Sequence, residues 1–454
     1  MSLTAIVFLL CFLAGLGLAL ARHPIYGLYT YIAVFYLDAP GRWWGAGLPN
    51  LRWALLIAAV TALAMLRLKP DPARTPWYRT FPAVFLIAYT IWLWIQTPWV
   101  LDQDLHRECA IIFTKYIIVY YMVYRLIDTP VLTADFLLAH VLGCMYLGLI
   151  AYSTGAPGGR LDGVGGPGID DSNTLGMHAS TAAVAGAMLI FAMRKWRRLA
   201  ALVSVPLILN MVVLTGSRGA FLALFMGGLA IFALRPRENL RLFYGLAFLG
   251  LLGFGYVASE AFWERMQTIE TAVKQEEDID KSAAGRIAQI EAGFRMFKAH
   301  PLGVGHRGFA VLSPEYLDPD FLDKDGGRSS HNTFISALVE QGLPGAVLFL
   351  LLWLWVLKSC VQTRNWALRK RPLLDVSLMT GICAGLAVVF IGGQFADFLK
   401  TEVQVWLLAL LSALLYLPNV ALGKSGARRL GPRDGAPSIS AQRPAKWRHR
   451  AYGS

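Results

Sequence analysis

The chain has 454 residues, of which 56% are hydrophobic and only 16% are charged, and its mean hydropathy is +0.50. Soluble domains carry about 25% charged residues, so this composition excludes an ordinary soluble protein of this length. We attribute the net charge of +13 to basic cytoplasmic loops of a membrane protein rather than to a surface that binds nucleic acid, and we expect no nucleic-acid partner.

Apolar runs that can cross a bilayer as helices follow one another along the chain. They cover residues 3–20, 25–37, 52–68, 81–98, 109–127, 132–153, 173–193, 199–215, 219–234, 240–258, 333–357, 374–396 and 403–422. The run 25–37 is short and can be half of a hairpin. The sequence therefore predicts an all-α polytopic membrane protein with about 12 transmembrane helices, 12 or 13 in all. The first run has no basic residue before it, so we expect a retained span rather than a signal peptide.

Basic residues recur in the loops on one side of these spans, which the positive-inside rule makes cytoplasmic. They lie at 67–79, 194–198, 235–241 and 358–371, and in the tail after 422. The opposite loops, at 98–108, 154–172, 216–218, 259–332 and 393–402, then face outward. The predicted organisation is N-terminal transmembrane helices (1–258), a large outer loop (259–332), C-terminal transmembrane helices (333–422) and a basic, disordered cytoplasmic tail (423–454).

The spacing of cysteines and glycines does not support a metal or nucleotide site. The five cysteines lie in or beside apolar runs without a metal-ligand spacing, so we interpret them as packing residues and expect no metal. Two hexamers, GVGGPG (163–168) and GVGHRG (303–308), match G-x-G-x-x-G. Neither follows a strand, so we interpret both as turns.

Two polar clusters of the outer side flank predicted spans. In TGSRG, Arg218 lies in a tight turn that Gly216 and Gly219 permit, where its guanidinium suits a phosphate or carboxylate. The alternative is an arginine that extends to lipid headgroups. In DDSN, residues Asp170 to Asn173 directly precede a span, so we expect them to cap a helix, with sugar binding as the alternative.

The large outer loop contains an amphipathic pattern. Ile287, Ile290, Phe294 and Phe297 recur at helical spacing, which predicts a helix lying on the outer surface. Arg286 stands at the start of this pattern, where a helix N-terminus already favours anions. The alternative is a solvated arginine on an exposed face.

His331 follows two serines and begins the span 333–357. An imidazole titrates near neutral pH and can accept a proton from an attacking hydroxyl. The alternative is a histidine that caps the helix or lies at the interface. The predicted topology places His331, Arg218 and Arg286 on one face, and one base with two arginines suits transfer from a lipid-linked, phosphate-bearing donor.

Four segments carry a resemblance to the bacterial O-antigen ligase and O-antigen polymerase family. They are HNTFISALVEQGLPGAVLFL from His331, TGSRGAFLAL from Thr215, GRIAQIEAGFRMFKAHPLGVGHRGF from Gly285, and DDSNTLG from Asp170. They resemble the family's His-Asn…Glu-x-Gly-x-x-Gly signature, its Ser-Arg-Gly turn, its Gly-Arg…Pro-x-Gly-x-Gly-x-x-Phe segment and its Asp-x-Asn element. The matching region runs from about 170 to 357.

The resemblance implies a glycosyltransferase of the multi-span GT-C-like type in the bacterial inner membrane, working at the periplasmic face without metal or cofactor. Its donor would be a glycan on undecaprenyl pyrophosphate and its acceptor a hydroxyl of lipid A–core, with membrane lipids around it. His331 would be the catalytic base, and Arg218 and Arg286 would hold the departing pyrophosphate. Possible supporting residues are Asn332, Asp170, Asn173, His306, Asp397 and Lys400.

Members of the family differ in their acceptor. The long loop before His331 favours a ligase. An O-antigen or exopolysaccharide polymerase and a protein O-oligosaccharyltransferase are the alternatives within the family. The segment 21–45 is similar to ligase-like proteins of exopolysaccharide loci, which leaves the acceptor open. A transporter of lipid-linked sugars ranks below these enzymes. Transporters place ionisable sites near the bilayer midplane and often contain internal repeats, whereas here the polar residues gather at one predicted interface and the sequence has no visible repeat.

Overall fold

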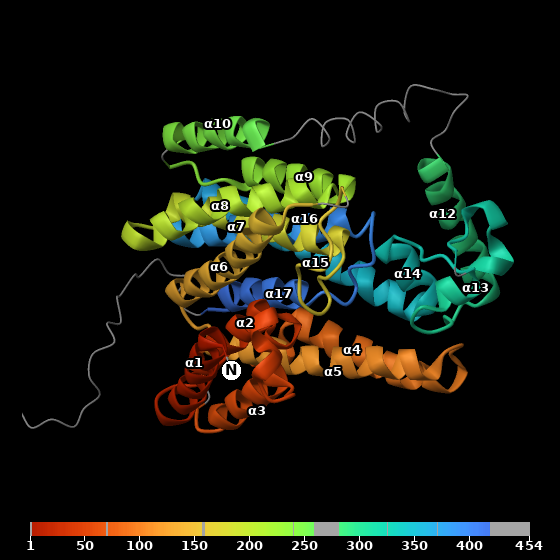
Figure 1. Ribbon diagram of the computed structural model, residues 1–454, viewed down its shortest axis with the longest axis horizontal. Helices are drawn as coiled ribbons and strands as arrows, with labels where there is room; N and C mark the ends of the chain where they lie inside the picture. The colour runs from red at the N-terminus through yellow and green to blue at the C-terminus, as the bar shows by residue number, and fades with distance from the viewer. Residues whose placement is uncertain are drawn as a thin grey trace, which may run out of the picture.

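The computed structural model describes residues 2–69, 71–156, 159–238, 240–257, 281–324, 326–369 and 371–417. All regular structure in these ranges is helical, and the long helices pack side by side as a bundle (Figure 1). The predicted tail at 423–454 and the first part of the large outer loop lie outside the described residues.

Eight helices of the described chain are long and apolar enough to cross a membrane. They are α1 (Leu3–Ala21), α4 with its 3-10 extension (Phe81–Trp99), α5 (Gln103–Leu126), α6 (Pro130–Thr154), α7 (Ser172–Ala192), α8 (Lys195–Thr215), α15 (Gly342–Leu368) and α16 (Leu373–Gly392). Shorter helices are α2 (Ile25–Leu37), α3 (Trp53–Met65), α9 (Arg218–Leu234), α10 (Leu240–Val257) and α17 (Glu402–Leu415). Their composition supports a polytopic membrane protein, while the number of 12 spans stays a prediction.

The centre of the bundle is built from α7, α16 and α17. Nearly all side chains of α7 and α16 are buried, and α7 packs against α8, α9 and α16. Both helices are rich in alanine, glycine and serine, whose small side chains let neighbouring backbones approach closely in a lipid environment. By contrast, α1 and α15 expose many leucines, as helices facing lipid do.

The predicted continuous span 333–357 is wrong, because the chain breaks there into α14 (Thr333–Glu340) and α15. Gly342 has a φ of +64°, a left-handed conformation that suits glycine. The segment 301–305 packs against the break and is hydrogen-bonded to its backbone. The backbone N–H groups of Val304 and Gly305 donate to the carbonyls of Val339 and Glu340, at 3.1 and 2.8 Å.

The described part of the large outer loop forms α12 (Lys281–Ala299), α13 (Gly308–Tyr316) and a short 3-10 turn (Pro319–Phe321). The predicted amphipathic helix is confirmed as a helix. Its residues Ala292 and Met296 are buried, while Ile287 and Phe294 are 55% and 50% exposed. Figure 1 shows α12, α13 and α14 gathered at one end of the bundle. The expected outer loop therefore packs onto the helix that follows His331.

Candidate functional site

The loop 393–401, which joins α16 to α17, holds the start of α14 in place. The backbone N–H of Thr333 donates to the Gly393 carbonyl at 2.6 Å. The Thr333 hydroxyl donates to the Ala396 carbonyl at 2.9 Å and accepts from the Phe398 N–H at 2.7 Å. Beside it, the Asn332 amide donates to Gln394 Oε1 at 3.3 Å. These bonds fix the position of the segment that carries His331.

Both candidate arginines belong to segments that meet the same loop at Phe395. The Arg286 guanidinium lies 5.1 Å from the centre of the Phe395 ring. Phe395 also packs against the first turn of α9, since a Cβ at Gly219 would lie only 2.6 Å from the Phe395 Cβ. Arg218 is the first residue of that helix and is half-buried. Phe395 therefore lies beside both arginine-bearing segments.

Two expectations for these arginines need correction. Gly216, with a φ of +57°, makes the expected turn. Gly219 lies inside α9 instead, where its lack of a side chain leaves room for Phe395. Arg286 does not stand at a helix start, because α12 begins at Lys281. An anion site at Arg286 would therefore depend on the guanidinium itself rather than on a helix N-terminus.

His331 lies between the buried Ser330 and the helix cap Asn332, and its φ is +47°. The alternative in which His331 caps the helix is wrong, because Asn332 Oδ1 accepts the N–H groups of Phe334 and Ile335. Burial lowers the pKa of His331, and the cations Arg328 and Arg286 lower it further, while Asp323 and Asp171 act in the opposite direction. The imidazole is thus neutral at neutral pH and can accept a proton.

The DDSN segment lies beside the Arg218 turn. Asp171 caps α7 as expected, accepting the N–H groups of Asn173 and Thr174, whereas Asp170 is exposed. Asn173 Oδ1 accepts a hydrogen bond from the Ser217 hydroxyl at 2.8 Å and another from Arg160 at 3.0 Å. The start of α7 is therefore bonded to the residue that directly precedes Arg218.

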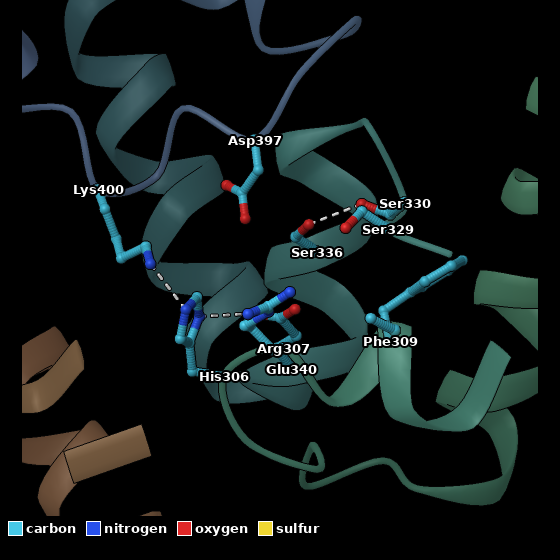
Figure 2. Close-up of a pocket in the computed structure, with 10 residues that line it drawn as sticks. His306, Arg307, Phe309, Ser329, Ser330, Ser336, Glu340, Asp397 and Lys400 are labelled. Carbon is cyan, nitrogen blue, oxygen red and sulfur yellow. Dashed lines mark hydrogen bonds and ion pairs between the residues drawn. The ribbon is translucent and has the colours of Figure 1, made fainter. Parts of the chain in front are cut away.

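A cavity of about 260 Å³ opens next to this region (Figure 2). It is lined by His306, Arg307, Phe309, Ala310, Ser329, Ser330, Ser336, Glu340, Asp397 and Lys400. Ser329 and Ser330, which form part of one wall, directly precede His331. The three candidate supporting residues His306, Asp397 and Lys400 thus share one cavity, and Figure 2 shows the Asp397 carboxylate directed into it.

A chain of hydrogen bonds crosses one side of this cavity. Lys400 Nζ lies 2.8 Å from His306 Nε2, and His306 Nδ1 lies 3.2 Å from Glu340 Oε2. A lysine ammonium only donates, so His306 accepts at Nε2 and donates from Nδ1 to the Glu340 carboxylate. His106 Nδ1 accepts the backbone N–H of His306 at 3.1 Å, which holds the main chain at this residue. The cavity therefore offers a fixed ammonium, two carboxylates and serine hydroxyls.

Sequence reasoning missed Glu340 as a site residue. A carboxylate inside an apolar run is costly in a membrane, which is the signal that could have found it. Its partner could not be found in this way, because His306 lies 34 residues earlier in the chain.

Comparison with known proteins bears on this region. Residues 203–350 match the model of the O-antigen ligase family. That segment of the chain belongs to the O-antigen ligase family. It contains Arg218, Arg286, His306, His331 and Glu340, so the resemblance noted in the sequence is confirmed at the level of the family. No curated protein matches the chain at a significant level. At the level of the family, the match supports a ligase- or polymerase-type glycosyltransferase, with a lipid-linked glycan and an acceptor as its general partners.

Proposed function

We propose that this protein is an O-antigen ligase of the bacterial inner membrane. It transfers a glycan from undecaprenyl pyrophosphate to a hydroxyl of lipid A–core at the periplasmic face, without a metal in the reaction. The observation that carries the proposal is the placement of Phe395, which joins the Arg286 side chain and the Arg218 turn to the loop that holds the His331 segment. The family match supports the reaction class.

In the proposed reaction His331 takes the proton of the acceptor hydroxyl. The hydroxyl oxygen then forms a bond to the anomeric carbon of the donor sugar, and the bond between that carbon and the phosphate oxygen breaks. The electron pair leaves with undecaprenyl pyrophosphate. Arg218 and Arg286 stabilise the negative charge that gathers on the pyrophosphate, because fixed guanidiniums at a water-poor site interact strongly with a developing anion.

The cavity of Figure 2 is the proposed site of the acceptor sugar. Its serine hydroxyls and the groups of Lys400 and Asp397 can donate to and accept from sugar hydroxyls. Ser329 and Ser330 of its wall directly precede His331, which is not itself among the residues that line the cavity. In the proposed reaction the acceptor hydroxyl therefore reaches His331 from the side of these two serines. Asn332 and Asn173 support the site by holding the His331 segment and the Arg218 turn.

Purified protein in vesicles tests the proposal directly. Undecaprenyl pyrophosphate carrying a defined glycan is offered with lipid A–core, with a second molecule of the donor, or with an unfolded protein. Glycosylated lipid A–core is the expected product. Elongated lipid-linked glycan would identify a polymerase instead, glycosylated protein an oligosaccharyltransferase, and movement of the donor across the vesicle membrane without transfer a transporter.

A further inference from the structure

A second group of polar side chains lies inside the helical bundle. His140 and Cys144 stand one turn apart on α6, His178 lies on α7 and Tyr36 on α2. All four are buried, with exposed fractions of 3% or less. None of them lines the cavity of Figure 2. Buried ionisable groups are costly among transmembrane helices, so this group needs a physical explanation.

The possible ligand atoms of this group converge on one point. One nitrogen from each histidine and the Cys144 sulfur lie within 4.8 Å of one another. The Tyr36 hydroxyl stands among them. It is hydrogen-bonded to His140 Nδ1, lies 2.7 Å from His178 Nε2 and is 3.7 Å from the Cys144 sulfur. Two imidazoles, one thiol and one phenol therefore face a common centre.

The ring of His140 is oriented by its neighbour Thr181. The Thr181 hydroxyl donates to the His178 carbonyl at 2.7 Å, so its oxygen accepts from His140 Nε2 at 3.0 Å. The nitrogen that carries the proton is thus Nε2, and the lone pair of Nδ1 points toward the centre. Metal-binding histidines are held in the same way, with the distal N–H donated to an oxygen.

Aromatic rings close the group off from water. Phe35 stacks on His178 with ring centres 5.8 Å apart, and Trp406 of α17 packs edge-on against His140 at 6.0 Å. Phe136 also packs edge-on against Trp406, at 5.9 Å. A dry, rigid shell of this kind holds ligands in place and is typical of structural metal sites rather than of catalytic ones, which keep a position open to water.

We propose that His140 Nδ1, Cys144 Sγ, His178 Nε2 and Tyr36 Oη form a structural binding site for a zinc ion. Nitrogen and thiolate ligands in a tetrahedral set are those that zinc prefers. On binding, the thiol and the phenol each release one proton to solvent. The two negative ligands then balance the double charge of the ion, which suits a site without water.

Such an ion fastens α2, α6 and α7 to one another. Trp406, which packs on both histidines, also donates from its indole N–H to Glu402 at 2.9 Å. Glu402 is the first residue of α17 and directly follows the loop 393–401. The zinc site thus supports α17, the helix that follows the loop 393–401 of the candidate active site. It takes no part in the transfer reaction itself.

The alternative is a metal-free cluster held by hydrogen bonds alone, and elemental analysis distinguishes the two. Protein purified in detergent from zinc-replete cells is assayed by mass spectrometry for zinc and other transition metals. We expect about one zinc per chain in the wild-type protein and in Cys109→Ser, a buried cysteine on a different helix. Cys144→Ser and His178→Gln should contain less than a tenth of that amount. Equal metal contents in all four proteins, or less than a tenth of a zinc per wild-type chain, would overturn the proposal.

A measurement on the wild-type protein covers the case in which the variants fail to fold. The zinc X-ray absorption spectrum should contain one sulfur neighbour at about 2.3 Å together with nitrogen or oxygen neighbours at about 2.0 Å. A membrane-permeable zinc chelator should lower the Tm of the wild-type protein, and added zinc should restore it. A spectrum without sulfur places the zinc elsewhere and overturns the assignment, as does a Tm that the chelator leaves unchanged.

Discussion

The Arg286 guanidinium lies over the ring of Phe395, with 5.1 Å between its central carbon and the ring centre. An aromatic face attracts a cation, so this contact favours the observed position of the arginine side chain. Because Phe395 also packs against Gly219, the same side chain contacts both the Arg286 guanidinium and the first turn of α9. Phe395 is therefore a positioning residue for the proposed pyrophosphate site.

Substitution Phe395→Leu should weaken binding of the lipid-linked donor without removing any charge. The lost cation–π contact corresponds to about 0.5–1 kcal/mol, so we expect the donor KM to rise by about two- to fivefold. The measurement is steady-state transfer in vesicles at varied donor concentration. Phe390→Leu, in α16 and packed on Phe334 and Trp353, is the matched control and should leave the KM unchanged. A larger effect in the control would contradict the assigned role.

The helices could be predicted from the sequence because hydropathy and length decide whether a segment can span lipid. Most of the predicted runs, such as 81–98, 219–234 and 374–396, begin within two residues of a helix in the structure. The break at Gly342 could not be predicted in this way, since the run 333–357 is apolar on both sides of it. It depends on the segment 301–305, which supplies the hydrogen bonds that a continuous helix would have made internally.

The candidate site was predictable only where a residue type was unusual for its place. Arg218 in a tight turn and His331 at the edge of a span stand out in the sequence. Glu340 stands out as a carboxylate in an apolar run, but its partner His306 does not, and neither do Phe395 and the proposed zinc ligands, because their roles arise from contacts between distant segments. The predicted topology places both arginines and His331 on one face, but the loop that contacts their three segments became evident only from the structure.

Substitution His331→Gln should reduce the transfer rate by a factor of about 10²–10⁴, the usual contribution of a general base. Glutamine keeps a polar side chain of similar size but cannot take the proton, so kcat should fall more than the donor KM rises. Transfer is measured with lipid A–core in vesicles. His300→Gln, an exposed histidine at the end of α12, is the control and should retain full activity. Full transfer by His331→Gln would refute the proposed base.

The pH dependence of transfer should follow the lowered pKa of His331. A base acts in its neutral form, so activity should persist below pH 6.5 and fall only when the pH drops through the lowered pKa. Arg328 lowers this pKa and Asp323 raises it. Arg328→Gln should therefore move the acid limb to higher pH, and Asp323→Asn should move it to lower pH. Shifts in the same direction, or none, would mean that another group titrates.

The pair formed by His306 and Glu340 is buried, with 6% and 5% of their side chains exposed. Substitution Glu340→Ala removes the acceptor of the His306 N–H and leaves a buried polar group unpaired, at a cost of about 1–3 kcal/mol. We expect a lower Tm in detergent. Glu340→Gln keeps an acceptor oxygen at the same position and should lose less than half as much. If both variants unfold at the wild-type temperature, the bond does not stabilise the fold.

Substitution Gly342→Ala should destabilise the protein strongly, although it adds only one methyl group. The residue has a φ of +64°, which costs a non-glycine residue about 1–3 kcal/mol, and the new Cβ would lie 2.3 Å from the Leu302 carbonyl carbon. Backbone atoms cannot move aside as a side chain can, so the segment 301–305 must leave the break between α14 and α15. That segment carries the chain into His306, so transfer activity should be lost together with thermal stability.

Gly228→Ala in α9 adds the same methyl group in open space and should change the unfolding free energy by at most about 1 kcal/mol. Equal Tm values for the two variants would show that the docking of 301–305 onto the break is not required.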